Sequence, residues 1–203
     1  MAMTDVQISN MALGHIGVQQ QIASLSTEHS TESNKCSLYY TQAVESVLAD
    51  YPWPFATKYA TLGLVTDNSA LSTPYDWLYE YRYPSDCLFV RRIVTVLGRK
   101  DPNPPPFRIG QDDQGLLVYT DQEDAVIEYT RRVTDTNLFP PTFAEAVSWR
   151  LAAFIAPGLS RLKDMVRLAM LTYLGILSKA ETQAGNEQQQ QDQIESEFIR
   201  ARD

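Results

Sequence analysis

The chain has 203 residues, a net charge of −8 and 44% hydrophobic residues. This composition is typical of a globular protein that buries a large core without disulfides or metal ions. The negative charge argues against a dedicated nucleic-acid binder, which carries a basic face, and against attraction to anionic membrane surfaces. The length suits one domain, or one domain with an inserted module.

The cysteines and the N-terminus indicate synthesis in a reducing compartment. Cys36 and Cys87 are the two cysteines, and they fall on an apolar helix face and at the start of a predicted strand, so we expect buried free thiols. Residues 1–5 show no basic segment followed by an apolar run, as a signal peptide would. No apolar run approaches the ~20 residues needed to span a bilayer. We therefore expect synthesis in the cytoplasm.

Residues 1–54 have the apolar spacing of two helices. Thr4 or Asp5 can cap the first helix, because a short oxygen-bearing side chain accepts hydrogen bonds from free backbone N–H groups. Gly17 provides a left-handed stop. The second helix must end near Asp50, since Pro52 and Pro54 cannot continue it. The buried faces are expected to consist of Ile8, Met11, Ala12, His15 and Ile16 in the first helix, and of Cys36, Tyr40, Ala43, Val44, Val47, Leu48 and Tyr51 in the second.

Residues 55–140 change to a period of two, which is typical of strands. The clearest alternation places four aromatic side chains on one strand face: Trp77, Tyr79, Tyr81 and Tyr83. We expect them to be core or subunit contacts, because tyrosine suits half-buried surfaces; stacking on sugars or bases is the alternative. Residues 88–97 continue the strand pattern, and residues 116–133, with the polar turn Asp121–Asp124, predict a hairpin. We expect about five or six antiparallel strands.

Helical spacing returns over residues 141–184. Thr142 and Glu145 have the spacing of a capping box, and Pro157 followed by Gly158 predicts the end of that helix. Ser160 is the expected cap of a further helix with the apolar positions Leu162, Val166, Ala169, Met170, Tyr173, Ile176 and Leu177. Residues 185–203 are rich in Gln and Glu, which predicts a weak solvated helix or a disordered arm.

The predicted fold class is therefore α+β. N- and C-terminal helices form a helical bundle, and an antiparallel β-sheet lobe is inserted between them in the sequence. We expect residues 1–54 and 141–184 to form the bundle, residues 55–140 to form the lobe, and residues 185–203 to form a C-terminal arm.

The residues suggest no catalytic site. Dinucleotide-binding, phosphate-loop, nucleophile-elbow and zinc-protease signatures are missing from the sequence. His15 and His29 lack the spacing of a metal site, and we expect His15 to be structural. Paired carboxylates can hydrolyse glycosides, but acidic residues are common in turns for backbone reasons, and the candidates all lie in predicted turns: Asp112, Asp113, Asp121, Glu123 and Asp124. We predict no catalytic residue, no metal site and no cofactor.

Four arginines fall in the predicted lobe: Arg91, Arg92, Arg131 and Arg132. They form a small basic patch if their strands pair. On a chain this acidic, salt bridges between subunits are favoured over nucleic-acid binding, and Arg91 and Arg131 are our candidates for such contacts or for the core. The proline-rich segment 101–107 is either a stiff loop between strands or a segment that docks on a partner.

Several short segments together resemble the phage head-to-tail adaptor family, also called tail tubular protein A. They are Ala12–Gly17 followed by Ile22–Leu25, then Tyr51–Ala56, then Tyr81–Leu88, and finally Tyr129–Val133 followed by Phe143–Ala146. The resemblance lies in their order and spacing along residues 5–185.

This resemblance implies a structural virion protein at the head-tail junction rather than an enzyme. Members of the family assemble as dodecameric rings under the portal, extend the DNA channel and offer a platform to the tail nozzle or tube. By resemblance, the bundle faces the portal, and the lobe lies toward the tail and neighbouring subunits. The arm docks into the portal, with Ile194, Phe198 and Ile199 as its anchors, and DNA passes through the lumen without specific binding.

Two alternatives remain open from the sequence. One is a tail-associated polysaccharide hydrolase that uses the turn carboxylates on the same scaffold. The other is a cytosolic interaction module unrelated to phages. The size of the purified protein distinguishes a ring from both, and release of reducing sugar identifies the hydrolase.

Overall fold

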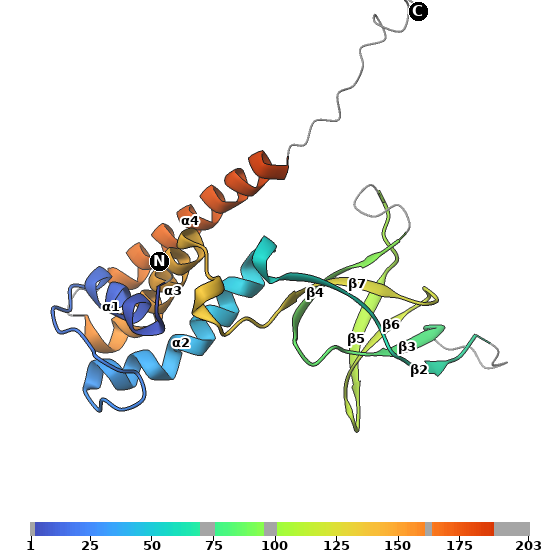
Figure 1. Ribbon diagram of the computed structural model, residues 1–203, viewed down its shortest axis with the longest axis horizontal. Coiled ribbons are helices and arrows are strands. Elements are labelled where there is room, and N and C mark those ends of the chain that lie inside the picture. The colour runs from blue at the N-terminus through green and yellow to red at the C-terminus, as the bar shows by residue number, and fades with distance from the viewer. Residues whose placement is uncertain (1–2, 70–75, 96–100, 161–163, 189–203) are drawn as a thin grey trace, which may run out of the picture.

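The computed structural model describes residues 3–69, 76–95, 101–160 and 164–188 (Figure 1). In these ranges the chain forms four α-helices and seven strands, and the strands make two antiparallel sheets. It is thus a protein of mixed α and β structure, as the sequence predicts. We refer to the helices α1–α4 as the helical part and to the strands β1–β7 as the β part; the two parts lie at opposite ends of the molecule in Figure 1.

The first helix begins and ends where the sequence predicts, and the second helix ends where the sequence predicts. Helix α1 (Asp5–His15) has Thr4 as its N-cap, and Thr4 and Gln7 form a reciprocal capping box. Gly17, with a φ of 79°, then takes the chain out of the helix. Helix α2 (Thr31–Asp50) is capped by the Ser30 side chain. The caps explain these starts, because each supplies an acceptor to a backbone N–H that has no partner within the helix.

Helix α3 (Pro141–Leu159) differs from the sequence-based expectation at both ends. The predicted capping box of Thr142 and Glu145 is wrong, because the helix starts one residue earlier, at Pro141, and has no side-chain cap. A proline has no backbone N–H, so at the first helical position it leaves no donor without a partner. Its fixed φ also suits the helix. The predicted break at Pro157 is also wrong: the helix continues to Leu159 and contains Pro157 in its last turn.

Helix α4 (Met165–Gln188) follows after a short connection and extends past residue 184, into the segment that we expected to form the arm. The hydroxyl of Ser160, which we expected to cap this helix, lies 3.3 Å from the carbonyl oxygen of Ile16 in the chain segment after α1. Leu162 lies outside the described residues. No helix in the described ranges is long and apolar enough to cross a membrane.

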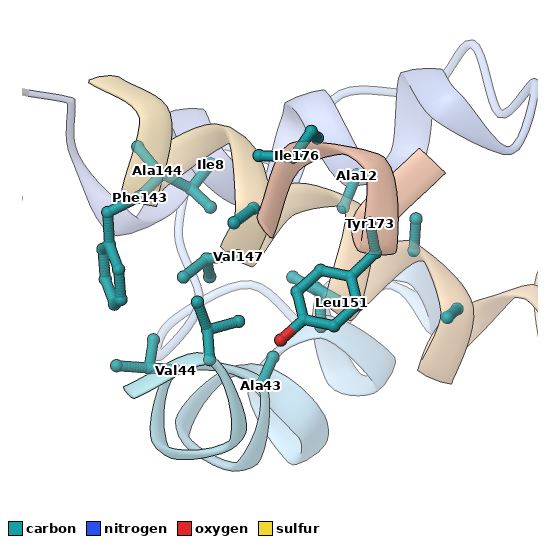
Figure 2. Packing of buried hydrophobic residues seen from close by; sticks show 14 of the residues in the cluster. Ile8, Ala12, Ala43, Val44, Phe143, Ala144, Val147, Leu151, Tyr173 and Ile176 are labelled. Atoms are coloured by element: carbon teal, nitrogen blue, oxygen red, sulfur yellow. The ribbon is translucent and has the colours of Figure 1, made fainter. Parts of the chain in front are cut away.

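The helices share one cluster of buried residues. Helices α1, α2 and α4 each pack against α3, which is therefore the central helix. Figure 2 shows side chains from all four helices meeting in this cluster: Ile8, Ala12, Ala43, Val44, Phe143, Ala144, Val147, Leu151, Tyr173 and Ile176. Most of these residues belong to the apolar faces predicted from helical spacing. Buried residues outside the predicted faces include Leu13 in α1 and Leu151 in α3.

The β part consists of two sheets. One has three strands in the order β1 (Thr57–Thr61), β7 (Val126–Arg131) and β4 (Cys87–Val94). The other has four, in the order β2 (Leu64–Asp67), β3 (Tyr79–Arg82), β6 (Gly115–Thr120) and β5 (Phe107–Asp112). All five strand pairs are antiparallel. The strands of the described residues number seven rather than the expected five or six, because β1 and β2 lack a clear alternation.

The predicted hairpin over residues 116–133 does not form. Strand β6 pairs with β3 and β5, whereas β7 pairs with β1 and β4, so the turn between β6 and β7 carries the chain from one sheet to the other. Asp124, with a φ of 49°, lies in this crossing. The hairpin that does form joins β5 to β6 through Asp113 and Gln114, and Gly115, with a φ of 136°, closes it.

A second cluster of buried residues fills the space between the two sheets. Tyr81 of β3 and Val118 of β6 contribute from one sheet, and Ile127 and Tyr129 of β7 contribute from the other. Tyr81 is 2% exposed, and its hydroxyl donates a hydrogen bond to the carbonyl oxygen of Gln122 at 3.0 Å. Tyr81 is therefore a core residue of the β part.

Candidate interaction surfaces

The helical and β parts are joined by a cluster of four aromatic side chains. Trp53 and Phe55 come from the link between α2 and β1, which includes the short 3-10 helix η1 (Pro54–Ala56). Phe139 follows the 3-10 helix η3 (Thr136–Leu138) on the return path, and Phe143 lies in the first turn of α3. The Phe143 ring lies 5.0 Å from Trp53, 4.9 Å from Phe55 and 4.6 Å from Phe139, all in edge-to-face geometry. Both chain segments that connect the helical and β parts therefore pack against the same Phe143 ring.

Arg91 makes a second connection between the two parts. From β4, its Nη2 donates hydrogen bonds to the carbonyl oxygens of Leu48, Ala49 and Tyr51, at 2.9, 3.0 and 3.1 Å. These carbonyls belong to the C-terminal end of α2, where backbone acceptors lack helical partners and a cation is favoured by the helix dipole. Its Nε donates to Oγ1 of Thr130 at 2.8 Å. Burial lowers the pKa of Arg91, but an arginine remains charged at neutral pH. Arg91 thus acts within one chain.

Replacing Arg91 with methionine should lower the free energy of unfolding by about 1.5–3 kcal/mol, the range for hydrogen bonds to charged groups. The substitution keeps much of the side-chain volume and leaves the carbonyls at the end of α2 without this donor. Chemical denaturation of the two proteins measures the difference. Arg108→Met on the exposed side of β5 is the matched control, and equal losses in both variants would show that the contacts of Arg91 add nothing to stability.

Two of the other three arginines of the predicted basic patch, Arg92 and Arg132, lie close to carboxylates of the same chain. Arg92 pairs with Glu128 on the adjacent strand, with 2.7 Å between Nε and Oε2. Arg132 pairs with Glu45 of α2 at 2.7 Å, which adds a further link between the β and helical parts. Strands β4 and β7 do pair, as the patch requires, but acidic partners neutralise Arg92 and Arg132. For Arg131, which is half-exposed on β7, a subunit contact stays a prediction.

Asp112 does not have the electrostatics of the general acid of a glycosidase. Asp112 forms a two-pronged ion pair with Arg82, with both N–O distances at 2.8 Å, and this contact holds the pKa of Asp112 at about 2. A general acid needs a raised pKa. Asp121 accepts a hydrogen bond from the backbone N–H of Leu78 and so fixes the start of β3. Within the described ranges, no three His, Cys, Asp or Glu side chains are grouped so that they could hold a metal ion.

His15 and Ser148 lie within hydrogen-bond distance, with 3.0 Å between Nε2 and Oγ. The Ser148 hydroxyl donates to the carbonyl oxygen of Glu145 at 2.8 Å, so the proton between His15 and Ser148 belongs to Nε2. Ser148 is fully buried, and the His15 ring stacks on Trp149 with 3.7 Å between the ring centroids. A serine without access to a substrate is not a nucleophile. The pair instead fixes α1 to α3, in agreement with the structural role predicted for His15.

Acidification should weaken the contact between α1 and α3. Burial lowers the pKa of His15 below its ordinary value, so the folded state disfavours the protonated ring. The stabilising contribution of the neutral ring is complete above the ordinary value of about 6.5 and is lost as the pH falls through the lowered pKa. We expect the melting temperature to fall between pH 7 and 5, and to fall less in His15→Gln. Parallel curves for the two proteins would contradict this.

Three residues of the predicted aromatic stripe belong to the β core or pack against it: Tyr81 is part of the core cluster, and Tyr79 and Tyr83 pack against that cluster. Tyr81 is buried between the sheets, whereas Trp77, Tyr79 and Tyr83 are half-buried. Trp77 precedes β3 and lines an open hollow of about 430 Å³, together with Glu80, Arg108 and Tyr119. Tyr83 lines a second open hollow of about 790 Å³ beside Leu62 and Leu116. The half-buried side chains remain candidates for subunit contacts.

Large apolar side chains are exposed on both parts of the molecule. On the helical part these are Leu38 of α2 and four residues of α4: Val166, Leu168, Leu171 and Leu174. On the β part they include Tyr59, Leu64, Val65, Phe89, Ile109 and Leu116. Val166 was expected on the buried face of α4 but is 38% exposed. The exposed leucines of α4 lie opposite that predicted face, and this position was the sequence signal that could have identified them. The proposed portal anchors Ile194, Phe198 and Ile199 lie outside the described residues.

No model of a known protein family matches the sequence, and no curated protein matches it either.

Proposed function

We propose that this protein is a structural virion protein, a head-to-tail adaptor whose copies form a ring between the portal and the tail nozzle or tube of a phage. The ring extends the DNA channel. The order and spacing of the resembling segments suggest this family, and one structural observation carries the proposal: the helical and β parts each present several large apolar side chains to solvent.

Exposed apolar side chains that lie close together mark surfaces that bind other molecules. On the helical part, Leu168, Leu171 and Leu174 follow one another along the outside of α4. On the β part, Leu64 and Leu116 lie in the same sheet, on either side of β3. An adaptor subunit needs such surfaces at both ends, because it contacts neighbouring copies, the portal and the tail.

A rigid connection between the parts also supports the proposal. The ring of Phe143 fixes both chain crossings, Arg91 connects β4 to the end of α2, and Arg132 pairs with Glu45. Copies that repeat around an axis form a closed ring only if every subunit presents its surfaces at the same angle. Connections of this kind limit the variation of that angle.

In this proposal the four helices act as a bundle that faces the portal, and the β part is an inserted lobe that lies toward the tail and neighbouring subunits. Residues 185–203 supply the arm that docks into the portal through Ile194, Phe198 and Ile199. The net charge of −8 favours passage of DNA without specific binding, because an acidic wall repels phosphates.

The decisive experiment images the purified full-length protein by electron microscopy, alone and mixed with its portal, and measures its mass by light scattering. A ring in either sample supports the proposal, whether it forms before or only after contact with the portal. A protein that stays monomeric and does not bind the portal would overturn it.

We predict that the turn carboxylates have no catalytic role. Replacing Asp112, Asp113, Asp121 and Asp124 with asparagine keeps an acceptor oxygen at each position and removes the charge. The variant should assemble like the wild type, because the pair of Asp112 with Arg82 is exposed and such pairs contribute little. Assays of reducing-sugar release from host polysaccharides should show no difference between the two proteins. An activity that is present in the wild type and absent from this variant would establish the hydrolase alternative.

A further inference from the structure

We propose that the outward face of α4 in one copy contacts the outward face of α2, around Leu38, in the next copy. This inference rests on the proposed ring and names the surfaces that meet in it. Four observations carry it: the positions of the α4 leucines, the occupation of the opposite face of α4, the charges beside the leucines, and the positions of α2 and α4 on the central helix.

The outward face of α4 carries Leu168, Leu171 and Leu174, which are 49%, 61% and 53% exposed. Because they are spaced by three residues, they cover about 120° of the helix circumference. The buried residues of the same helix lie on the other side: Met165, Ala169, Tyr173, Ile176 and Ala180. Helix α4 is thus apolar on both faces, which is expected when both faces are covered.

The inward face is already occupied. The Tyr173 hydroxyl donates a short hydrogen bond of 2.6 Å to Asp50 at the end of α2. The Arg150 guanidinium of α3 lies over the rings of Phe154 and Tyr173, at 4.9 and 5.3 Å. These contacts hold α4 in one orientation on α3, so the helix does not rotate to bury its leucines within the same chain. Nothing in the described part of the chain covers them, so we assign their cover to a second molecule.

The charges around the leucines favour another copy of this chain as that molecule. Residues 168–178 contain no charged side chain, and the residues on either side of this stretch, Arg167 and Lys179, are both cationic. Residues 1–54 contain five acidic residues and one lysine, a net charge of −4. Arg167 lies 3.8 Å from the carboxylate of Asp164, so Lys179 is the main cation beside the apolar face, and it complements the acidic surface of the N-terminal helices.

Leu38 is the residue of α2 that we assign to the contact with the α4 leucines. At 64% it is the most exposed large apolar side chain of the described residues. It points away from Cys36, Ala43 and the other buried residues of α2, and its exposed helical neighbours Asn34, Thr41 and Gln42 are uncharged. Lys35, which is also near Leu38, leans toward Gly158 of α3.

The charges beside the two apolar faces include one complementary pair. Glu32 lies about 9 Å from Leu38 along α2, and Lys179 lies about 12 Å from Leu171 along α4. Glu45, on the other side of Leu38, already pairs with Arg132 of the same chain. A rim pair of Lys179 with Glu32 adds little affinity, but it fixes the register of the two helices.

The arrangement of the helices permits this contact to repeat. Helices α2 and α4 both pack on α3, and they lie on either side of it in Figure 1. Their outward faces belong to different surfaces of the molecule, so a contact of α4 with α2 is head-to-tail. Contacts of this type close into a ring when the rotation between copies is suitable.

Disulfide cross-linking tests the contact. The native cysteines are buried, Cys36 fully and Cys87 to 8% exposure, so introduced surface cysteines are the ones that react. Full-length Leu171→Cys and Leu38→Cys proteins are mixed and oxidised, with and without portal. We expect a covalent dimer that contains one copy of each variant, and a ladder of larger species when one chain carries both substitutions. Leu64→Cys on β2, 55% exposed, replaces Leu38→Cys in the matched control and should not cross-link to Leu171→Cys.

The outcomes separate this inference from the proposed function. A ring seen by electron microscopy without the cross-link between positions 171 and 38 overturns the inference and leaves the adaptor proposal standing. Efficient cross-linking of Leu171→Cys to itself would indicate a two-fold contact and also overturns the inference. A wild-type protein that forms no ring with or without portal overturns both. In addition, Leu171→Glu should abolish ring formation at an unchanged melting temperature, whereas Leu64→Glu should leave the ring intact.

Discussion

Replacing Phe143 with alanine should lower the free energy of unfolding by about 3–5 kcal/mol, the usual cost of removing a buried phenylalanine ring. Phe143 has no exposed surface, and its ring contacts Trp53, Phe55 and Phe139 in edge-to-face geometry. Its loss leaves a cavity beside three rings that cannot all move inward, because all three of them lie in the links to the β part. Chemical denaturation at equilibrium measures the change.

The same substitution should loosen the connection between the helical and β parts. We expect limited proteolysis of Phe143→Ala to cut the two links, residues 51–56 and 134–140, faster than it cuts the wild type. Phe89→Ala is the matched control, since Phe89 is 49% exposed and its closest described aromatic contact is with the Arg91 guanidinium at 4.7 Å; we expect a loss below ~1 kcal/mol there. If both variants lose the same stability, the aromatic cluster is not what joins the two parts.

Replacing Tyr81 with alanine should cost about 2–4 kcal/mol. The ring fills the space between the two sheets, and its hydroxyl donates to the carbonyl of Gln122 in the segment where the chain crosses from β6 to β7. Two effects therefore add: a cavity in the β core, and the loss of a hydrogen bond that holds the crossing. Thermal and chemical denaturation should both show the loss.

Two further variants separate these effects. Tyr81→Phe keeps the ring and should cost about 1 kcal/mol, the net value of a single hydrogen bond. Tyr59→Ala removes a tyrosine that is 50% exposed on β1 and should have a smaller effect than Tyr81→Ala. Unchanged stability of Tyr81→Ala combined with lost binding of a sugar or nucleic acid would instead support the stacking role.

Short-range patterns in the sequence determined the helices and most strands. Thr4, Gly17 and Pro52 act on backbone groups within a few residues, so they set the limits of α1 and α2 without reference to the rest of the chain. The alternation around Tyr81 likewise determined a strand with one buried face. The start of α3 was misjudged because two local signals compete there, and the proline at position 141 acts one residue before the threonine cap.

The pairing of the strands depended on the tertiary structure. Residues 116–133 carry every local sign of a hairpin, yet β6 and β7 belong to different sheets. A local pattern specifies that a segment is extended, but it does not specify which strand lies beside it, because each edge can pair with any segment whose buried face matches. Here β3 and β5 occupy both edges of β6.

The sequence by itself determined the classes of element, their order, the burial of Tyr81 and the structural role of His15. Only the tertiary structure decided what Arg91 does, because its three carbonyl partners lie 40 to 43 residues earlier in the chain. It likewise decided which apolar residues of α4 remain exposed. Periodicity identifies an apolar face on a helix. When a helix has two apolar faces, the packing of the neighbouring helices decides which of the two is buried. Tyr173 faces α3 and the end of α2 in this fold, and Leu171 therefore faces outward.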